Sequence, residues 1–157
     1  MTNEEIINAC SLLRKYGIKS MTQNIIGLPT ETMKEALETL KINIACKPTY
    51  AWVSIFQPYP GTELGEFTEE KGLLEEDPSK IEKSFFDKSI LRLRDKKKIE
   101  HLQKLFAITV DNPWIYKTGL LNMLISMPHS NMIKNFYKKA YQIHRKRADT
   151  KLYGMRI

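Results

Sequence analysis

Two short apolar segments, residues 20–26 and 50–56, are joined by a helical pattern, and each runs directly into a loop rich in glycine and proline. The helical pattern begins at Thr32, three residues before Glu35 as in a capping box, and its apolar residues recur at helical spacing to Ile44. Strands connected through a crossover helix pair in parallel. The sequence therefore predicts a βαβ unit whose two loops lie at the carboxyl ends of the strands, where parallel sheets place their ligands.

The second of these segments is almost wholly apolar. Successive side chains of a strand point to opposite faces, so we expect both faces of this strand to be buried. We interpret its aromatic residues as core rather than as a platform for stacking bases. The two alternating sets are Tyr50, Trp52 and Phe56 on one side and Ala51, Val53 and Ile55 on the other.

The other expected elements are helices. Residues 2–16 begin with a second capping-box pair, Thr2 and Glu5, and stop before Gly17, which takes a left-handed conformation without a Cβ clash. Residues 62–71 form a short helix after the second strand. Beyond a polar loop, helical patterns cover residues 95–110, 114–126 and 130–147, with Pro113 and Pro128 between them.

Charge is distributed unevenly along the chain. Residues 1–91 carry 10 Lys/Arg and 14 Asp/Glu, whereas residues 92–157 carry 15 Lys/Arg and 4 Asp/Glu. With 42% hydrophobic and 27% charged residues, wholesale disorder is excluded, and no apolar run approaches the roughly 20 residues of a membrane-spanning helix. The first residues lack a signal-peptide pattern. We expect a cytoplasmic protein with an α/β part over residues 1–72 and a basic, mainly α-helical extension over residues 73–157.

The cysteines and histidines do not form a recognisable ligand motif. Cys10 and Cys46 make no disulfide framework, which favours a reducing compartment, and Cys10 is interpreted as a buried thiol on the apolar side of the first helix. His101, His129 and His144 fall on different helices without ligand spacing. We therefore predict neither a metal site nor catalytic residues from them.

The loops nevertheless carry a family resemblance. The segments NIIGLPTET (residues 24–32), KP (47–48) and FQPYPGTEL (56–64) together resemble the C-terminal half of a radical S-adenosylmethionine (SAM) enzyme. The resemblance is to members with an N-terminal cobalamin-binding domain, related to the anaerobic magnesium-protoporphyrin cyclase. It implies an α/β fold, the C-terminal part of a (β/α)6 partial TIM barrel, in which residues 2–16 are the fourth helix and residues 20–26 and 50–56 are the fifth and sixth strands.

The resemblance also implies a binding site for the adenine of SAM. In this family the turn after the fifth strand and the end of the sixth strand pack against that ring. Members commonly have glycine where this chain has Gln23 and Thr30. Glu31 is equally well explained as a carboxylate at a helix start, where the helix dipole favours it. The residues that match the two places are Ile25, Gly27, Pro29, Glu31, Phe56, Gln57, Pro58 and Tyr59.

One part of the family pattern is absent. Radical SAM enzymes hold a 4Fe-4S cluster with three cysteines spaced CxxxCxxC, because the fourth iron stays open for SAM. Cys10 and Cys46 cannot supply three thiolates. We therefore expect a truncated fragment, a chain from an internal start or one half of a split enzyme, inactive alone. Its expected partners are SAM, an organic substrate and the missing N-terminal half, and cobalamin enters only through the resemblance.

The basic extension leaves a second interpretation open, a non-catalytic module that binds a membrane surface, RNA or a protein partner. The helical pattern over residues 130–147 combines a lysine- and arginine-rich face with Phe136, Tyr137 and Tyr141. Such a helix favours peripheral association with an anionic membrane, whereas its ordinary interpretation is a solvated face. Nucleic acid is not favoured as a partner.

Overall fold

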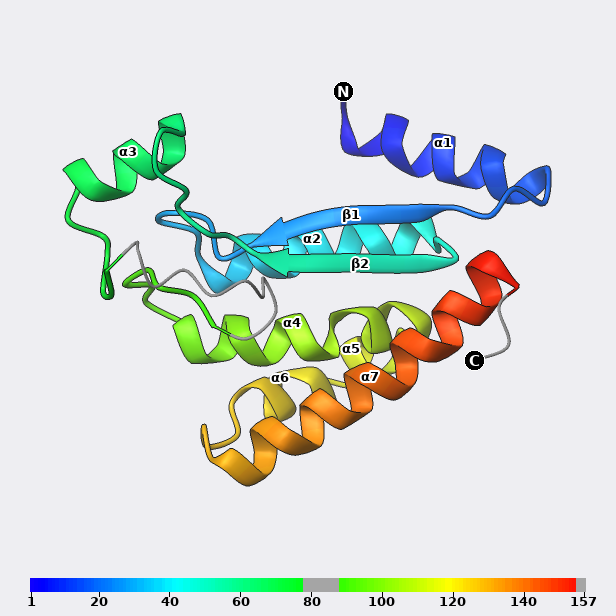
Figure 1. Cartoon of the computed structure of the whole chain (residues 1–157). Helices are drawn as coiled ribbons and strands as arrows, with labels where there is room; N and C mark the ends of the chain where they lie inside the picture. Colours follow the sequence, from blue (N-terminus) through cyan, green and yellow to red (C-terminus); the bar gives the residue numbers. More distant parts are fainter. Residues whose placement is uncertain (78–87, 155–157) are drawn as a thin grey trace.

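The computed structural model describes residues 1–77 and 88–154 (Figure 1). Its first four elements follow in the predicted order: helix α1 (Asn3–Lys15), strand β1 (Met21–Ile26), helix α2 (Met33–Cys46) and strand β2 (Tyr50–Ile55). The strands pair in parallel, with Met21 opposite Tyr50 and Ile26 opposite Ile55. The parallel pairing predicted from the crossover helix is thereby confirmed, and the short helix α3 (Glu63–Glu70) follows β2.

Local side-chain hydrogen bonds fix where the first two helices begin. The Thr2 hydroxyl accepts from the Glu5 amide at 3.2 Å, and the Glu5 carboxylate accepts from the Thr2 amide at 2.6 Å. Thr32 and Glu35 repeat this exchange at 3.4 and 2.8 Å. Both predicted capping boxes are confirmed, since each pair satisfies amides that the first turn leaves free.

The C-terminal helices differ in two places from the sequence expectation. They are α4 (Lys96–Asp111), α5 (Trp114–Lys117), α6 (Leu120–Ile125) and α7 (Asn131–Tyr153). The single helix expected over residues 114–126 is wrong, because Gly119 takes φ 78° and separates α5 from α6. Helix α7 continues past residue 147 and ends at Gly154, which takes φ 69° and provides a left-handed cap.

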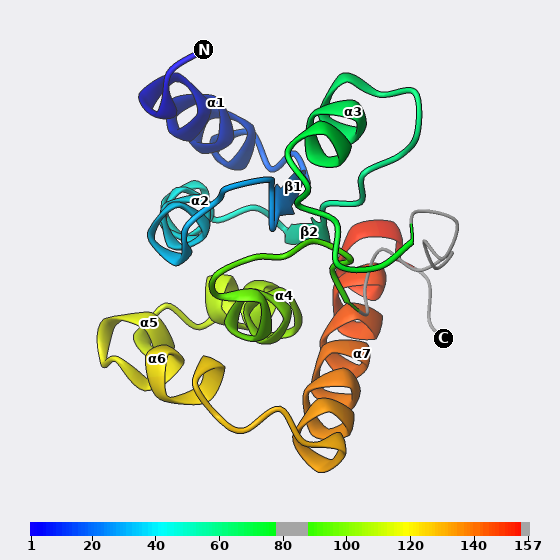
Figure 2. The same ribbon diagram turned by 90° about the vertical axis from the view of Figure 1, so that its left-hand side faces the viewer.

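One hydrophobic core joins the early and late parts of the chain. Helix α4 packs against both β2 and α2, and Figure 2 shows α2 and α4 on the same side of the strand pair. The core thus contains residues from both sides of residue 72, where the sequence predicts the boundary between the α/β part and the helical extension. That boundary stays a prediction. Its buried members include Ile26, Ala36, Leu40, Ala51, Val53, Ile99, Leu102, Phe106, Leu121, Ile125 and Tyr137.

The other face of the strand pair is exposed mainly on β1. Ala51, Val53 and Ile55 are buried, but Trp52 is only partly buried and Ile25 of β1 is 52% exposed. On this face of β2, Tyr50 and Ser54 are 3% and 6% exposed, and Trp52 packs against the cluster of Tyr50, Ala107 and Ala148. The expectation that both faces of β2 are buried is therefore confirmed for all its residues except Trp52, which is partly buried. The described residues contain this one strand pair, so the (β/α)6 barrel stays a prediction.

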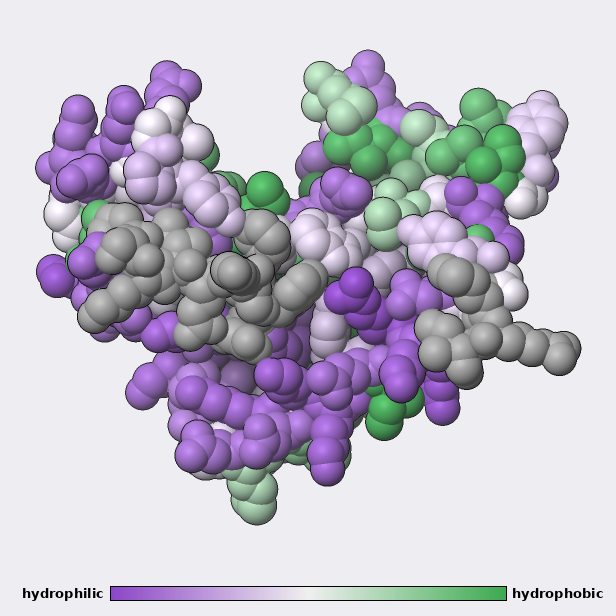
Figure 3. Space-filling model, viewed as in Figure 1, coloured by the Kyte–Doolittle hydropathy of each residue, from purple (hydrophilic) through white to green (hydrophobic). Residues whose placement is uncertain are grey.

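Helix α1 lies beside α2 and has no buried residue. Cys10 is partly exposed, so its interpretation as a buried thiol is wrong, and Leu12 and Tyr16 are 56% and 68% exposed. Figure 3 shows hydrophobic side chains gathered on the surface at the upper right, where α1 lies. The apolar side of this helix is consequently left largely uncovered by the described part of the chain.

Candidate ligand-binding site

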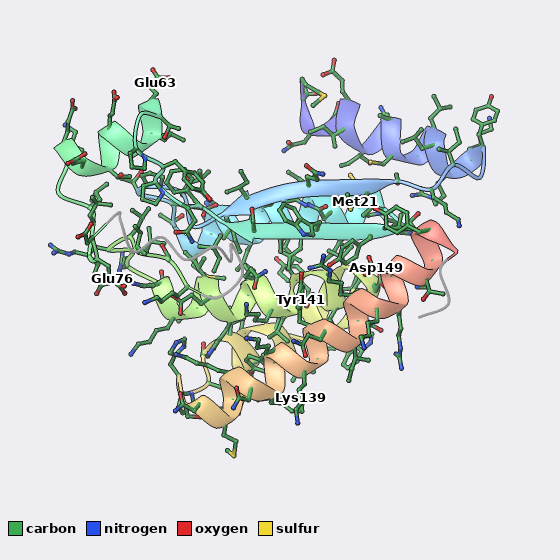
Figure 4. All side chains as sticks on the ribbon, in the orientation of Figure 1. Met21, Glu63, Glu76, Lys139, Tyr141 and Asp149 are labelled. Carbon is green, nitrogen blue, oxygen red and sulfur yellow. The ribbon has the colours of Figure 1, made fainter. Side chains whose placement is uncertain are left out.

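A groove of about 670 Å³ opens on the uncovered face, at the carboxyl ends of the strands. Residues near the carboxyl ends of both strands form its floor, and the loop after β2 and the start of α3 form a wall. Figure 4 shows Glu63 on α3 at this end of the molecule, with Met21 at the opposite end of β1. The lining residues are Gln23, Asn24, Ile25, Trp52, Ser54, Ile55, Phe56, Gln57, Tyr59, Thr62, Glu63 and Leu64.

A polar network holds the floor of the groove to α2. The Thr22 hydroxyl donates to Asn43 Oδ1 at 2.6 Å, and Asn43 Nδ2 donates to Asn24 Oδ1 at 2.8 Å. Asn24 Nδ2 in turn donates to the Trp52 carbonyl at 2.8 Å, which links the two strands. These side chains satisfy one another's hydrogen bonds, so the polar residues of β1 that face α2 leave no buried polar group unpaired.

The structure brings together half of the residues that the resemblance implies for adenine binding. Ile25, Phe56, Gln57 and Tyr59 line the groove, whereas the other four do not. Those four belong to the turn after β1 or to the buried part of the loop after β2. They are Gly27, Pro29, Glu31 and Pro58.

Glu31 is engaged with its own turn. Its carboxylate accepts hydrogen bonds from the amides of Gly27 and of Leu28, the latter at 3.1 Å. Burial raises the pKa of Glu31, and these two amide hydrogen bonds act in the opposite direction. The geometry thus gives Glu31 the task of holding the strand-to-helix turn.

Gly27 faces the core rather than the groove. It takes φ 76°, and a Cβ at this position would lie 3.4 Å from a methyl group of Ile99 and 3.5 Å from one of Ile55. Thr30, three residues later, has φ 66°. A β-branched side chain such as that of Thr30 is strained in this left-handed region, whereas glycine adopts it without strain. This explains why glycine suits position 30.

Gln57 is the most informative residue of the groove. Its side chain is 6% exposed, and Nε2 donates to the Lys88 carbonyl at 3.0 Å. Its Oε1 is buried and has no hydrogen-bond partner in the described parts of the chain. An unsatisfied buried acceptor costs about 1–3 kcal/mol, and Gln103 Oε1, which does not line the groove, is unpartnered in the same way.

Several lining residues were missed by sequence reasoning. Trp52, which the sequence predicts as core, packs against the cluster of Tyr50, Ala107 and Ala148 and also lines the groove beside Ile25. Alternation along β2 indicated that Trp52 and Phe56 share a face, although it did not reveal that this face borders the groove. Thr62 and Glu63 lie where the expected short helix begins, directly after the loop that the resemblance singled out.

The cysteines do not fit a 4Fe-4S cluster. Cys46 is buried, and burial together with the neighbouring Cys10 thiol raises the pKa of Cys46 to about 11. Such a thiol resists forming the thiolate that an iron ligand requires. Across residues 1–77 and 88–154, no three His, Cys, Asp or Glu side chains are arranged to hold a metal ion.

The histidines, in contrast, are not scattered. His129 Nδ1 lies 3.1 Å from His101 Nε2, and the two rings stack with centroids 5.0 Å apart. His144 Nε2 lies 3.0 Å from a carboxylate oxygen of Asp111. The spacing of these residues gave no indication of the first pair, because the pair depends on how the loop before α7 packs against α4.

The aromatic side chains of α7 are divided between core and solvent. Tyr137 and Tyr141 are 1% and 8% exposed, whereas Phe136 is 66% exposed. The Tyr137 hydroxyl donates to the Leu124 carbonyl at 2.8 Å. The interpretation of Tyr137 and Tyr141 as part of a surface that faces a membrane is therefore wrong. Within the described ranges, no helix is long and apolar enough to cross a bilayer.

Comparisons with known proteins find similarity over parts of the chain. No protein-family model matches it. It is 35% identical over 74 residues, 47% of its length, to an uncharacterized methyltransferase of Pyrococcus horikoshii. It is 28% identical over 114 residues, 70% of its length, to a tRNA-2-methylthio-N(6)-dimethylallyladenosine synthase of a Sulfurihydrogenibium species. The matched stretches make up 16% and 25% of these relatives, neither of which is described as cobalamin-binding.

Proposed function

We propose that this chain is part of a SAM-dependent enzyme of the radical SAM type, and that its groove binds the adenosyl portion of SAM. The names of the two relatives, a methyltransferase and a tRNA-2-methylthio-N(6)-dimethylallyladenosine synthase, support SAM chemistry. The observation that carries the proposal is a largely apolar groove at the carboxyl ends of the strands, lined by Gln57, whose Oε1 is buried and unpartnered. The proposal does not extend to cobalamin.

The chemistry of adenine fits the groove. Adenine has two flat apolar faces and an exocyclic amine that donates hydrogen bonds. The side chains of Ile25, Trp52 and Phe56 offer apolar and aromatic surface, and Gln57 Oε1 offers an acceptor. A site that accepts a hydrogen bond from the exocyclic amine of adenine rejects a purine with a carbonyl at the same ring position, because two hydrogen-bond acceptors would then face each other.

The role proposed for these residues is to bind and orient. When bound, SAM supplies a methyl group or the precursor of a radical. Gln57 is held in place by its bond to the Lys88 carbonyl, so its free oxygen is already positioned before a ligand arrives. The cluster does not fit the two thiols of this chain, so the proposal assigns its ligands to another part of the whole enzyme.

The open face and the outer edge of β1 fit the same proposal. β1 has a strand partner on one edge within the described residues, and the groove lies on the face that α2 and α4 do not cover. Further parallel strands of a barrel would pair with that edge and close the groove. The organic substrate would then enter from the same side.

The test is to titrate the full chain with SAM and with its inosine analogue by NMR. We expect millimolar or tighter binding of SAM with shifts at Trp52 and Gln57, and weaker binding of the inosine analogue. Gln57→Leu should weaken SAM binding about tenfold and abolish the preference. Gln103→Leu is the matched control, because Gln103 is a buried glutamine that binds the Val53 carbonyl at 3.1 Å away from the groove lining. Absence of saturable shifts, or a Gln57→Leu protein that folds and binds SAM as the wild type does, would overturn the proposal.

A further inference from the structure

A second cavity, of about 240 Å³, lies apart from the groove. It is enclosed by the segment before α4, by α4 itself, by the loop before α7 and by the first turns of α7. Four lysines and one glutamate give it a strongly basic lining. The lining residues are Lys88, Glu100, His101, Lys104, His129, Lys134, Asn135, Tyr137 and Lys138.

Hydrogen bonding fixes the tautomers of the two histidines in this cavity. His101 Nδ1 lies 3.2 Å from the Ile125 carbonyl, which only accepts, so Nδ1 carries the hydrogen. His101 Nε2 is then an acceptor, and His129 Nδ1 must donate to it across 3.1 Å. This leaves His129 Nε2 facing a carboxylate oxygen of Glu100 at 3.3 Å. One proton must lie between these two atoms, since otherwise two lone pairs would meet.

The shared proton neutralises the only acid of the cavity lining. Glu100 is 6% exposed, and its other oxygen accepts from the Ser89 amide at 3.1 Å. Burial raises the pKa of Glu100, while burial and Lys134 lower the pKa of His129 to about 4. With one proton shared between them, the Glu100–His129 pair carries no net charge. The positive charge of the surrounding lysines is therefore not balanced by Glu100.

The lysines are arranged around the cavity from three directions. Lys88 comes from the segment before α4 and also pairs with Glu76 at 2.9 Å. Lys104 projects from α4, with its ammonium 6.0 Å from the centroid of the Tyr141 ring. Lys134 and Lys138 follow one another by one turn of α7, and Lys134 has no ion-pair partner within the described residues. Glu76 offsets the charge of Lys88, so Lys104, Lys134 and Lys138 supply most of the positive charge of the lining, which suits an oxyanion with more than one charge.

We propose that this cavity binds a phosphate group, carried by a phosphomonoester or a phosphodiester. The lysines supply the charge, while the Asn135 amide adds a neutral hydrogen-bond donor to the lining. Lys88 borders both sites, because its carbonyl accepts from Gln57 of the groove and its side chain lines the cavity. A phosphate here would be a second recognition point beside the groove, and the inference stands without the proposed SAM site.

The test uses the full chain and two probes, inorganic phosphate and a single-stranded RNA oligonucleotide. The readout is the shift of the His129 ring resonances by NMR. We expect saturable shifts with phosphate and a roughly fivefold loss of affinity in Lys134→Gln. Lys139→Gln is the matched control, since Lys139 lies on the same helix, is exposed and does not line the cavity (Figure 4).

The two probes separate the sources of the phosphate. Displacement of phosphate by RNA, with the same loss in Lys134→Gln, would assign the cavity to a phosphodiester backbone. Phosphate binding that RNA does not disturb would assign it to a small phosphomonoester. The proposal fails if phosphate produces no saturable shift of His129, or if Lys134→Gln and Lys139→Gln lose affinity equally.

Discussion

Helices α1 and α4 are both amphipathic and both pack against α2, yet their surroundings are opposite. Much of α4 is buried, and Ile99, Leu102 and Phe106 are fully inaccessible to solvent. Helix α1 buries no residue, and its Leu12 and Tyr16 side chains are mostly exposed. Figure 2 shows α4 beneath the strand pair and α1 standing away from it, beside α2. An amphipathic pattern therefore predicts a helix without specifying whether its partner surface lies in the same chain.

The same contrast divides the two faces of the strands. The face toward α4 is closed by side chains of this chain, and the opposite face carries the groove. Under the proposed function, the uncovered side of α1 and the open face have one cause, because both would be covered by the rest of the enzyme and its ligands. Side chains on the face toward α4 should then contribute most of the free energy of unfolding.

The largest difference in the free energy of unfolding is expected between two alanine substitutions of apolar helix residues. Phe106→Ala on α4 should lower the free energy of unfolding by about 3–5 kcal/mol, because it empties a fully buried site. Leu12→Ala on α1 should change it by less than about 0.5 kcal/mol, because that side chain is 56% exposed. Urea unfolding followed by circular dichroism measures both. Equal losses would show that α1 is buried in solution and would break the comparison.

The next test compares two glycines with nearly the same backbone. Gly27 and Gly17 have φ 76° and 69°, but an added Cβ meets core side chains at Gly27 and open space at Gly17. Gly17→Val should cost about 1–2 kcal/mol from left-handed strain, and Gly27→Val about 3 kcal/mol, because packing against Ile99 adds to the strain. Thermal unfolding of both variants checks this. If Gly27→Val is as stable as Gly17→Val, the turn moves freely away from α4.

Features that depend on neighbouring residues were predictable from the sequence. Thr2 and Thr32 form their capping boxes because the partners lie three residues away, and the parallel pairing follows from the crossover helix. Gly119 shows the limit of local patterns, since a glycine within apolar spacing gives no sign of whether it continues or ends a helix. The barrel expected from the resemblance stays a prediction.

The sites depended on contacts distant in sequence. Half of the implied adenine-site residues reach the groove, because the turn at Gly27 packs toward α4 and away from the groove. Trp52 gave no sign of the groove because apolar alternation is the same whether a neighbouring strand, a ligand or solvent covers the face. The contact of Glu100 with His129 joins residues from α4 and the loop before α7, and no spacing indicates it.

A smaller effect is expected from the buried carboxyl of α4. Burial raises the pKa of Glu100 above its ordinary value of 4.5, so the native state binds the proton more tightly than the unfolded state. Its contribution is full below the unfolded-state pKa and is lost as pH rises through the native pKa. Glu100→Gln, which mimics the protonated acid, should match wild-type stability at pH 4, below the unfolded-state pKa, and exceed it by about 1 kcal/mol at pH 8. Urea unfolding at both pH values measures this. A variant less stable than wild type at pH 8 would show an ionised Glu100 paired with a protonated His129.

The smallest effect is expected at Thr30, in the turn between the open groove and the covered core. Thr30 has φ 66°, where a β-branched side chain is strained by about 1–2 kcal/mol. Thr30→Gly removes this strain but gives the unfolded chain more freedom, which offsets about 0.5–1 kcal/mol of the gain. The net stabilisation should be about 0.5–1 kcal/mol in urea unfolding. Thr32→Ala, two residues away, should instead lose about 1 kcal/mol, because Thr32 caps α2. A loss of stability in Thr30→Gly would mean that the threonine side chain makes contacts in solution that outweigh its strain, and that the turn is held by more than Glu31.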